Sequence, residues 1–181
     1  MGIPLEALVG RHGWSMGGRR RRPPFFQTKK VAILGCTESI RYAPWTDPSW
    51  TLVAHNSARN LMEREPDWWM DLHTPACFQQ KKKWAPTYYT WLQEQHTPIF
   101  MQEAYPHIPA AVRYPKERIL SEYRPFFTNQ VAWMIALALT EGVRDIGLYG
   151  CQYKADTEYG IQRESCVYWL GRFEGAGGRV H

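Results

Sequence analysis

Two histidines and one arginine lie at positions where their side chains could transfer a proton or bind an anion. His55 and His73 each follow a short apolar run, and Asp71 lies two residues before His73. Histidine gains or loses a proton near neutral pH, so His73 is a candidate general base for a hydroxyl acceptor, with a structural hydrogen-bonding role as the alternative. Arg163 could clamp a phosphate or a carboxylate through its bidentate guanidinium. We therefore predict His73 and Arg163 as catalytic residues.

A second group of residues is suited to binding a ligand. Its members are Gly35, Thr37, Ser39, Asn56, Thr128 and Asn129. In residues 35–39 the glycine lets backbone N–H groups approach a ribose or phosphate, and two hydroxyls add donors. Asn56 offers a donor and an acceptor to a base or sugar, and the pair at 128–129 begins a helix whose free N–H groups favour an anion. The alternatives are a tight strand-to-loop turn at 35–39, a turn residue at Asn56 and a plain N-cap at Thr128.

These residues need a sheet to bring them together, and the apolar pattern predicts one. The run Val31–Leu34 is apolar at every position, as in a parallel strand covered on both faces, and ligands bind at the carboxyl ends of such strands. Further short apolar runs cover 51–55, 68–72, 98–101 and 145–150. Their alternation with helical segments predicts a Rossmann-like three-layer α/β sandwich with a mostly parallel sheet.

The clearest helix lies between residues 128 and 142. A polar N-cap, a nearly all-apolar run and a terminal glycine indicate a central, buried helix. Other helices are predicted over 58–64, 79–95 and about 163–171, and Pro86 must begin or interrupt the second of them. Residues 102–115 are rich in Pro and Tyr and are predicted to be a loop.

Length and charge indicate one domain preceded by a basic arm. The chain has 181 residues, 44% of them hydrophobic, and contains no apolar run of about 18 residues. Residues 1–30 hold seven Lys or Arg, including Arg19–Arg22, against one Glu, whereas the rest is close to neutral. We expect a disordered arm over 1–28 and a single domain over 29–181, which stops where another strand would begin and is a candidate for truncation after His181.

The cysteine content and the motifs along the chain indicate which kinds of partner to expect. Four cysteines at wide, irregular spacings match neither a zinc site nor a disulfide scaffold, so we expect reduced thiols and a cytoplasmic protein. The sequence assigns no metal ligand, and it leaves a metal requirement open. The basic arm could contact nucleic-acid phosphates, but the chain contains no nucleic-acid recognition motif, and this partner is not favoured. The expected partner is a small nucleotide ligand, with no membrane association.

Several of these segments, in their order along the chain, resemble the nucleotide-binding core of bacterial sialyltransferases and of the related archaeal-type hydroxymethylpterin pyrophosphokinase-like proteins. The matching segments are Gly35-Cys36-Thr37-Glu38-Ser39, His55-Asn56, Phe127-Thr128-Asn129-Gln130 and the stretch from Glu141 to Gly150. The chain is also similar to uncharacterised Rossmann-like proteins common in bacteriophage genomes. The resemblance implies a nucleotide or nucleotide-activated donor and a glycosyl- or phosphoryl-type transfer.

Three departures from that family bear on the reaction. Glu38 would place a negative charge near a phosphate, and Gln152 stands where the family has an acidic residue. The family histidine expected after the Gly150 strand is missing from residues 151–168, which argues against literal sialyl transfer. Two interpretations stay open: a small transferase, or a non-enzymatic protein that binds or sequesters a nucleotide, as a phage could encode.

Overall fold

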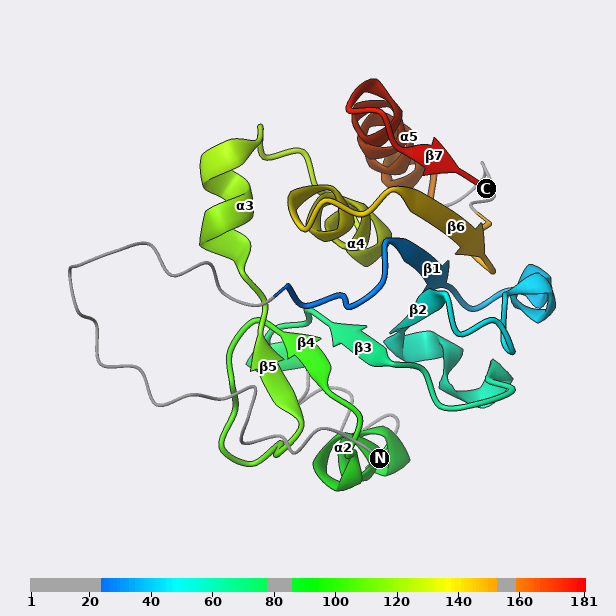
Figure 1. Cartoon of the computed structure of the whole chain (residues 1–181). Helices are drawn as coiled ribbons and strands as arrows, with labels where there is room; N and C mark the ends of the chain where they lie inside the picture. The colour runs from blue at the N-terminus through cyan, green and yellow to red at the C-terminus, as the bar shows by residue number, and fades with distance from the viewer. Residues whose placement is uncertain (1–23, 78–85, 153–158) are drawn as a thin grey trace.

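The computed structural model describes residues 24–77, 86–152 and 159–181. Its centre is a sheet whose described strands run parallel in the order β5-β4-β3-β2-β1-β6-β7 (Figure 1). The strands are β1 (Lys30–Leu34), β2 (Trp50–His55), β3 (Trp68–Asp71), β4 (Ile99–Met101), β5 (Ala111–Arg113), β6 (Asp145–Tyr149) and β7 (Arg179–Val180). The helices are the 3-10 helices η2 (Glu38–Tyr42) and η3 (Asn56–Leu61) and the α-helices α2 (Pro86–Glu94), α3 (Lys116–Glu122), α4 (Gln130–Thr140) and α5 (Tyr159–Gly175).

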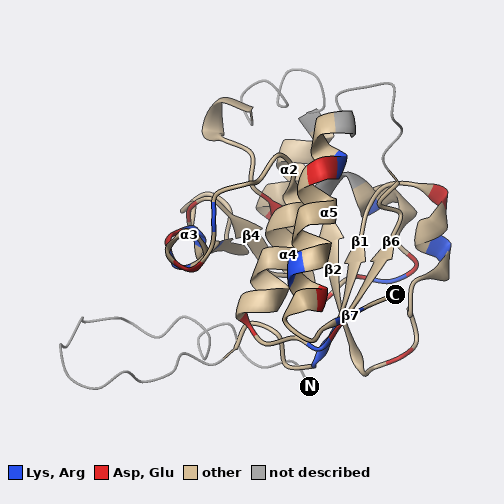
Figure 2. Ribbon diagram, turned by 90° about the horizontal axis from the view of Figure 1, so that it is seen from above, with Lys and Arg blue, Asp and Glu red and all other residues tan. Residues whose placement is uncertain are grey.

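Strand β1 shows why the sheet has a layer on each face. Val31 and Ile33 lie in a core cluster with residues of α4 and α5, whereas Ala32 and Leu34 lie in a second cluster with residues of α2. All four side chains are buried. Figures 1 and 2 show α4 and α5 on one face of the sheet and α2 on the other. An uninterrupted apolar strand needs both covers, so the predicted Rossmann-like α/β sandwich is confirmed.

The strand order creates a reversal point between β1 and β6. From β1 the chain builds outward to β5, and then returns to place β6 on the other side of β1. Because α4 leads into the start of β6 and α5 follows its end, both helices begin at the edge where the strands finish. We call this the carboxyl edge. In open α/β sheets ligands bind outside this edge, at the point where strand order reverses.

Some elements differ from the sequence prediction. The segment 102–115, predicted as a loop, contains β5, and α3 follows it. β5 has three residues and pairs only with β4 at the sheet edge, so the pairing, and not a local apolar pattern, makes it a strand. The helix predicted over 58–64 is the 3-10 helix η3. Helix α2 begins at Pro86, as its fixed φ favours, and the part predicted over 79–85 lies outside the described residues.

The packed domain begins before residue 29. Phe26 is buried, and the Phe25 ring makes edge-to-face contacts with Trp68 and Phe100 at centroid distances of 5.9 and 5.2 Å. These two phenylalanines fall inside the arm predicted over 1–28, whose residues 1–23 lie outside the described part. The aromatic pair therefore belongs to the core that α4 covers.

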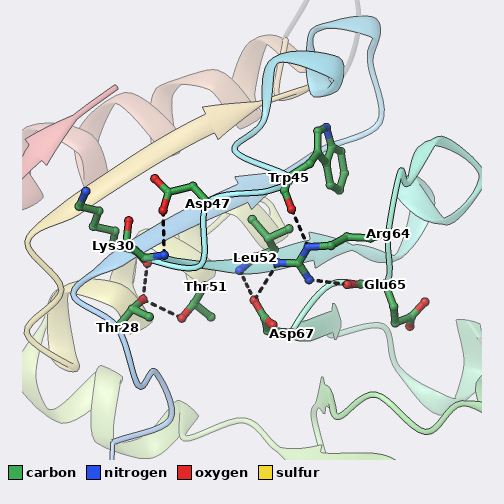
Figure 3. Close-up of polar contacts among 10 residues, drawn as sticks. Thr28, Lys30, Trp45, Asp47, Thr51, Leu52, Arg64, Glu65 and Asp67 are labelled. Carbon is green, nitrogen blue, oxygen red and sulfur yellow. Dashed lines mark hydrogen bonds and ion pairs between the residues drawn. The ribbon is translucent and has the colours of Figure 1, made fainter.

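Polar side chains tie together the loops at the other edge, where β1 and β2 begin (Figure 3). Thr28 Oγ1 lies 2.8 Å from Thr51 Oγ1, and Asp67 Oδ2 accepts a hydrogen bond from the Leu52 N–H at 2.7 Å. Arg64 Nε donates to the Trp45 carbonyl at 2.9 Å. These polar groups satisfy one another's hydrogen-bonding capacity, so they fix the loops at this edge.

Candidate active site

A buried carboxylate lies at the end of β3 and contacts two titratable side chains. Asp71 is fully buried, its Oδ1 contacts His73 Nδ1, and its Oδ2 accepts a hydrogen bond from the Tyr88 hydroxyl. The His73 backbone N–H also donates to Oδ1, at 3.1 Å. A hydrogen bond from His73 to a carboxylate oxygen places the imidazole proton on Nδ1, and in the neutral ring Nε2 then carries the lone pair. This arrangement suits His73 to accept a proton.

The backbone between the two residues is held from both sides. The Leu72 N–H donates to Gln130 Oε1 on α4 at 3.2 Å, and the Leu72 carbonyl accepts from Gln102 Nε2 at 2.7 Å. These contacts fix the turn that carries His73 after β3. The His73 side chain is 31% exposed, so it remains within reach of a substrate while its carboxylate partner is shielded from water.

Aromatic residues from the loop after β4 pack against α2, the helix that also carries Tyr88. The His107 ring stacks on Tyr89 at a centroid distance of 6.1 Å and lies 5.8 Å from Tyr105. Burial, together with the charges of Glu103 and Asp71, raises the pKa of Tyr105. Tyr105 therefore remains a protonated donor at neutral pH, close enough to Asp71 to feel its charge.

The turn after β1 lies against the end of β6. The Gly35 N–H donates to the Tyr149 carbonyl at 2.7 Å, and the Thr37 N–H to the Gly150 carbonyl at 3.2 Å. A Cβ on Gly35 would lie 2.2 Å from the Gly150 oxygen, which no side chain permits. Gly150 has a φ of +72°, in the region that favours glycine. The small residue at position 35 thus allows two strand ends to approach each other.

The two hydroxyls predicted to bind ligand in this turn differ. Ser39 Oγ accepts a hydrogen bond from the Gly150 N–H at 3.0 Å, so it stabilises the same strand-end contact. Thr37 precedes η2 without capping it, and its Oγ1 is buried with no hydrogen-bond partner among the described residues. Of the pair, Thr37 keeps an unused hydroxyl at the reversal point.

Thr128 and Asn129 join the starts of two helices. Asn129 Oδ1 caps α4 by accepting from the Ala132 N–H at 2.9 Å, and its Nδ2 donates to the Gln162 carbonyl at 2.6 Å. Thr128 Oγ1 donates to the Ile161 carbonyl at 3.2 Å. The N-cap of α4 is therefore Asn129 and not Thr128, to which a plain N-cap was assigned as the alternative role, and both side chains fasten α4 to α5. Their predicted role toward an anion remains a prediction.

The other predicted site residues lie along the same edge. Arg163 is exposed near the start of α5, next to the residue that Asn129 holds. Asn56 begins η3 directly after β2, and its side chain lies outside the described part. The fold thus brings His73, Arg163 and the turn of Gly35 to one edge, whereas no described contact joins the turn to His73.

Cys151 follows the end of β6, and its thiol is not activated as a nucleophile. Burial raises the pKa of the Cys151 thiol well above its usual range, and its Sγ lies 3.8 Å from the Ile33 carbonyl. A thiol of this kind stays protonated and is a poor nucleophile. No group of three His, Cys, Asp or Glu residues in the described ranges could hold a metal ion.

Tyr88 is a site residue that the sequence did not indicate. Its hydroxyl reaches Asp71 across 17 residues of sequence. The spacing Asp-x-His at a strand end was the usable signal for His73 and Asp71, but nothing local marks the tyrosine that joins them.

Searches against protein-family models, curated proteins and solved structures found no significant match to this chain. The fold defines it as a Rossmann-like α/β protein. Among its described helices none is both long and apolar enough to cross a membrane.

Proposed function

We propose that this protein is a small transferase that binds a nucleotide-activated donor at the carboxyl edge and uses His73 to activate a hydroxyl acceptor. The observation that carries the proposal is the contact of His73 Nδ1 with the fully buried Asp71 carboxylate. A buried carboxylate that fixes the tautomer of a partly exposed histidine is a common arrangement for a general base.

In the proposed step Nε2 of His73 takes the proton from the acceptor hydroxyl. The oxygen then forms a bond to the glycosyl carbon or the phosphorus of the donor. The bond from that atom to the nucleotide phosphate breaks, and its electron pair leaves with the phosphate. Asp71 stabilises the imidazolium until the proton is released, and Tyr88 keeps the carboxylate in place.

The leaving phosphate needs positive potential at the same edge. Helices α4 and α5 both begin there, and their N-termini favour an anion. Arg163, exposed near the start of α5, adds a full charge in this proposal. Thr37, with its unpartnered hydroxyl, would receive the donor at the β1–β6 reversal point, together with Gly35, Ser39 and the predicted contacts of Asn56, Thr128 and Asn129.

The second candidate is a protein that binds or sequesters a nucleotide without turnover. The observation that favours it is the buried, unpartnered hydroxyl of Thr37 at the β1–β6 reversal point, which suits a bound ligand and involves no base. This candidate needs the same edge and the same ligand, but no base.

One experiment separates the two candidates. Thermal-shift screening of the whole chain against nucleoside monophosphates, their sugar and diphosphate derivatives and NAD identifies the bound class, because a ligand of the native state alone raises Tm. His73→Gln should then bind the same nucleotide with an unchanged shift but lose turnover by about 100-fold or more in an acceptor screen.

Exposed His96→Gln serves as the control, since it removes an imidazole that lies between the end of α2 and the start of β4, outside the candidate site. Unchanged turnover in His73→Gln would exclude the base, and binding without any turnover in the wild type would favour the sequestering protein. No shift with any nucleotide would exclude both candidates.

A further inference from the structure

Arg59 is held in place by two aromatic rings at the carboxyl edge. It lies in η3, directly after β2, and its guanidinium carbon is 5.2 Å from the ring centre of Tyr88 and 5.8 Å from that of Trp91. The side chain is partly exposed. Stacking of this kind fixes the plane of the guanidinium while its N–H groups still point outward along the edges of that plane.

Arg59 also differs in its charge balance from those described arginines that form ion pairs. Ion pairs with carboxylates involve Arg64, Arg113, Arg118 and Arg179. For Arg59 the described residues provide ring contacts and no carboxylate partner. A guanidinium that is oriented by aromatic rings but not paired with a carboxylate can bind an anion from outside the chain.

The ring beneath Arg59 belongs to the candidate active site. Tyr88 is buried, and its hydroxyl donates to Asp71, whose other oxygen contacts His73. Arg59 therefore stands one side chain away from the carboxylate that orients the proposed base. Because all these side chains follow the ends of β2 and β3 or begin α2, they occupy one part of the carboxyl edge.

We infer that Arg59 binds a phosphate group of the donor, an inference that rests on the proposed function. The planar fork of a guanidinium matches two phosphate oxygens, and its charge gains strength as the leaving phosphate takes up the electron pair. The base and the phosphate-binding group then come from neighbouring strands, β3 and β2, which places the reacting bond between them.

The test uses inorganic pyrophosphate as the probe and the whole chain. Calorimetric titration should give binding that weakens about tenfold or more in Arg59→Gln, and less in Arg59→Lys, which keeps the charge but loses the fork. Arg172→Gln is the matched control, because Arg172 also lies over a tyrosine ring, 5.7 Å from Tyr123, but near the end of α5. Its affinity should stay within twofold of the wild type.

A second measurement needs no variant. Modification by phenylglyoxal, followed at each arginine by peptide mass spectrometry, should slow several-fold at Arg59 when pyrophosphate is present, and should not change at Arg172. Equal pyrophosphate affinity in Arg59→Gln, absence of binding by the wild type, or absence of protection at Arg59 would each overturn the inference.

Failure of the inference is distinguishable from failure of the proposed function. His73→Gln should retain pyrophosphate binding and protection of Arg59, because the inference gives the His73 imidazole no contact with the phosphate. Protection of Arg59 in a protein without turnover leaves the inference standing and removes the transferase. Turnover without protection of Arg59 removes only the inference.

Discussion

At the scale of single residues, the contact that matters most is the one between His73 and Asp71. The carboxylate is fully buried and the imidazole partly exposed, so one side chain is shielded and the other can meet a substrate. Burying a carboxylate is unfavourable unless hydrogen bonds compensate, and here His73 and Tyr88 both contribute. The unfavourable burial of the Asp71 carboxylate is consistent with a functional role for Asp71 and His73, because buried titratable groups cluster at active sites.

The tautomer of His73 tests this pair without a substrate. Asp71→Ala removes the acceptor of the Nδ1 proton, so the ring should shift toward the mixture of tautomers found in water, and stability should fall by about 1–3 kcal/mol because Tyr88 loses its partner. Nitrogen chemical shifts of labelled imidazoles report the tautomer.

Tyr88→Phe is the control for that experiment, because it removes the hydrogen bond of the Tyr88 hydroxyl to the same carboxylate and leaves the His73 side chain in place. A ring that keeps its Nδ1 proton in folded Asp71→Ala would show that Asp71 does not position His73.

At the scale of elements, the ends of β1 and β6 lie so close together that a side chain at position 35 would meet the Gly150 backbone. The register of β1 and β6 pairs Leu34 with Tyr149, so Gly35 and Gly150 directly follow the two paired strand ends. Backbone hydrogen bonds cross from Gly35 to Tyr149 and from Thr37 to Gly150. A glycine at position 35 is therefore required by the neighbouring strand, whatever the turn also binds.

Gly35→Ala should lower the free energy of unfolding by about 3 kcal/mol or more, since the new Cβ would meet backbone and one strand end must move. Urea unfolding followed by circular dichroism measures the change. Gly175→Ala, the same substitution at the end of α5 with no atom within 4 Å of the new Cβ, should leave stability unchanged or raise it by up to about 1 kcal/mol. Equal effects at the two positions would contradict the close approach of β1 and β6.

At the scale of the whole molecule, an acidic side chain at the start of β6 holds the last strand of the sheet. Asp145 accepts hydrogen bonds from Arg179 Nε and Nη2 at 2.7 and 2.9 Å, and His181 Nε2 lies 2.9 Å from Oδ1. Hydrogen bonds from Arg179 and then from His181 lower the pKa of Asp145 well below its usual range. The Asp145 carboxylate thus links β6 to its neighbouring strand β7.

This depressed pKa makes stability depend on pH with a definite sign. In the unfolded chain the carboxyl takes up its proton near pH 4, whereas in the folded protein it stays ionised to lower pH. The stabilisation is therefore complete above about pH 5 and disappears as the pH falls through 4 and below. The Tm of Asp145→Asn should lie below that of the wild type at neutral pH, and the two values should converge in acid.

Calorimetric Tm values between about pH 2 and pH 7 measure the difference. Exposed Glu174→Gln is the control and should follow the wild type at every pH. A gap between Asp145→Asn and wild type that is constant with pH would mean that packing, and not the charge, holds β7.

The sequence by itself determined the elements whose local pattern is complete. The apolar run of β1 requires two covers, the polar cap and terminal glycine bound α4, and the spacing of Asp71 and His73 puts both at the end of one strand. From these the α/β class and the edge that carries the candidate site follow. β5 escaped prediction, because three residues at a sheet edge become a strand only through their neighbour.

Only the tertiary structure decided what the candidate residues touch. Ser39 lies against Gly150 across 111 residues, Asn129 against Gln162 across 33, and Arg59 over rings of α2. Such partners come from packing between distant segments, which no local periodicity encodes. The physical reason is that a hydrogen bond or an ion pair needs two groups. The residue type determines what a side chain can donate, accept or neutralise, and the fold determines which partner it meets.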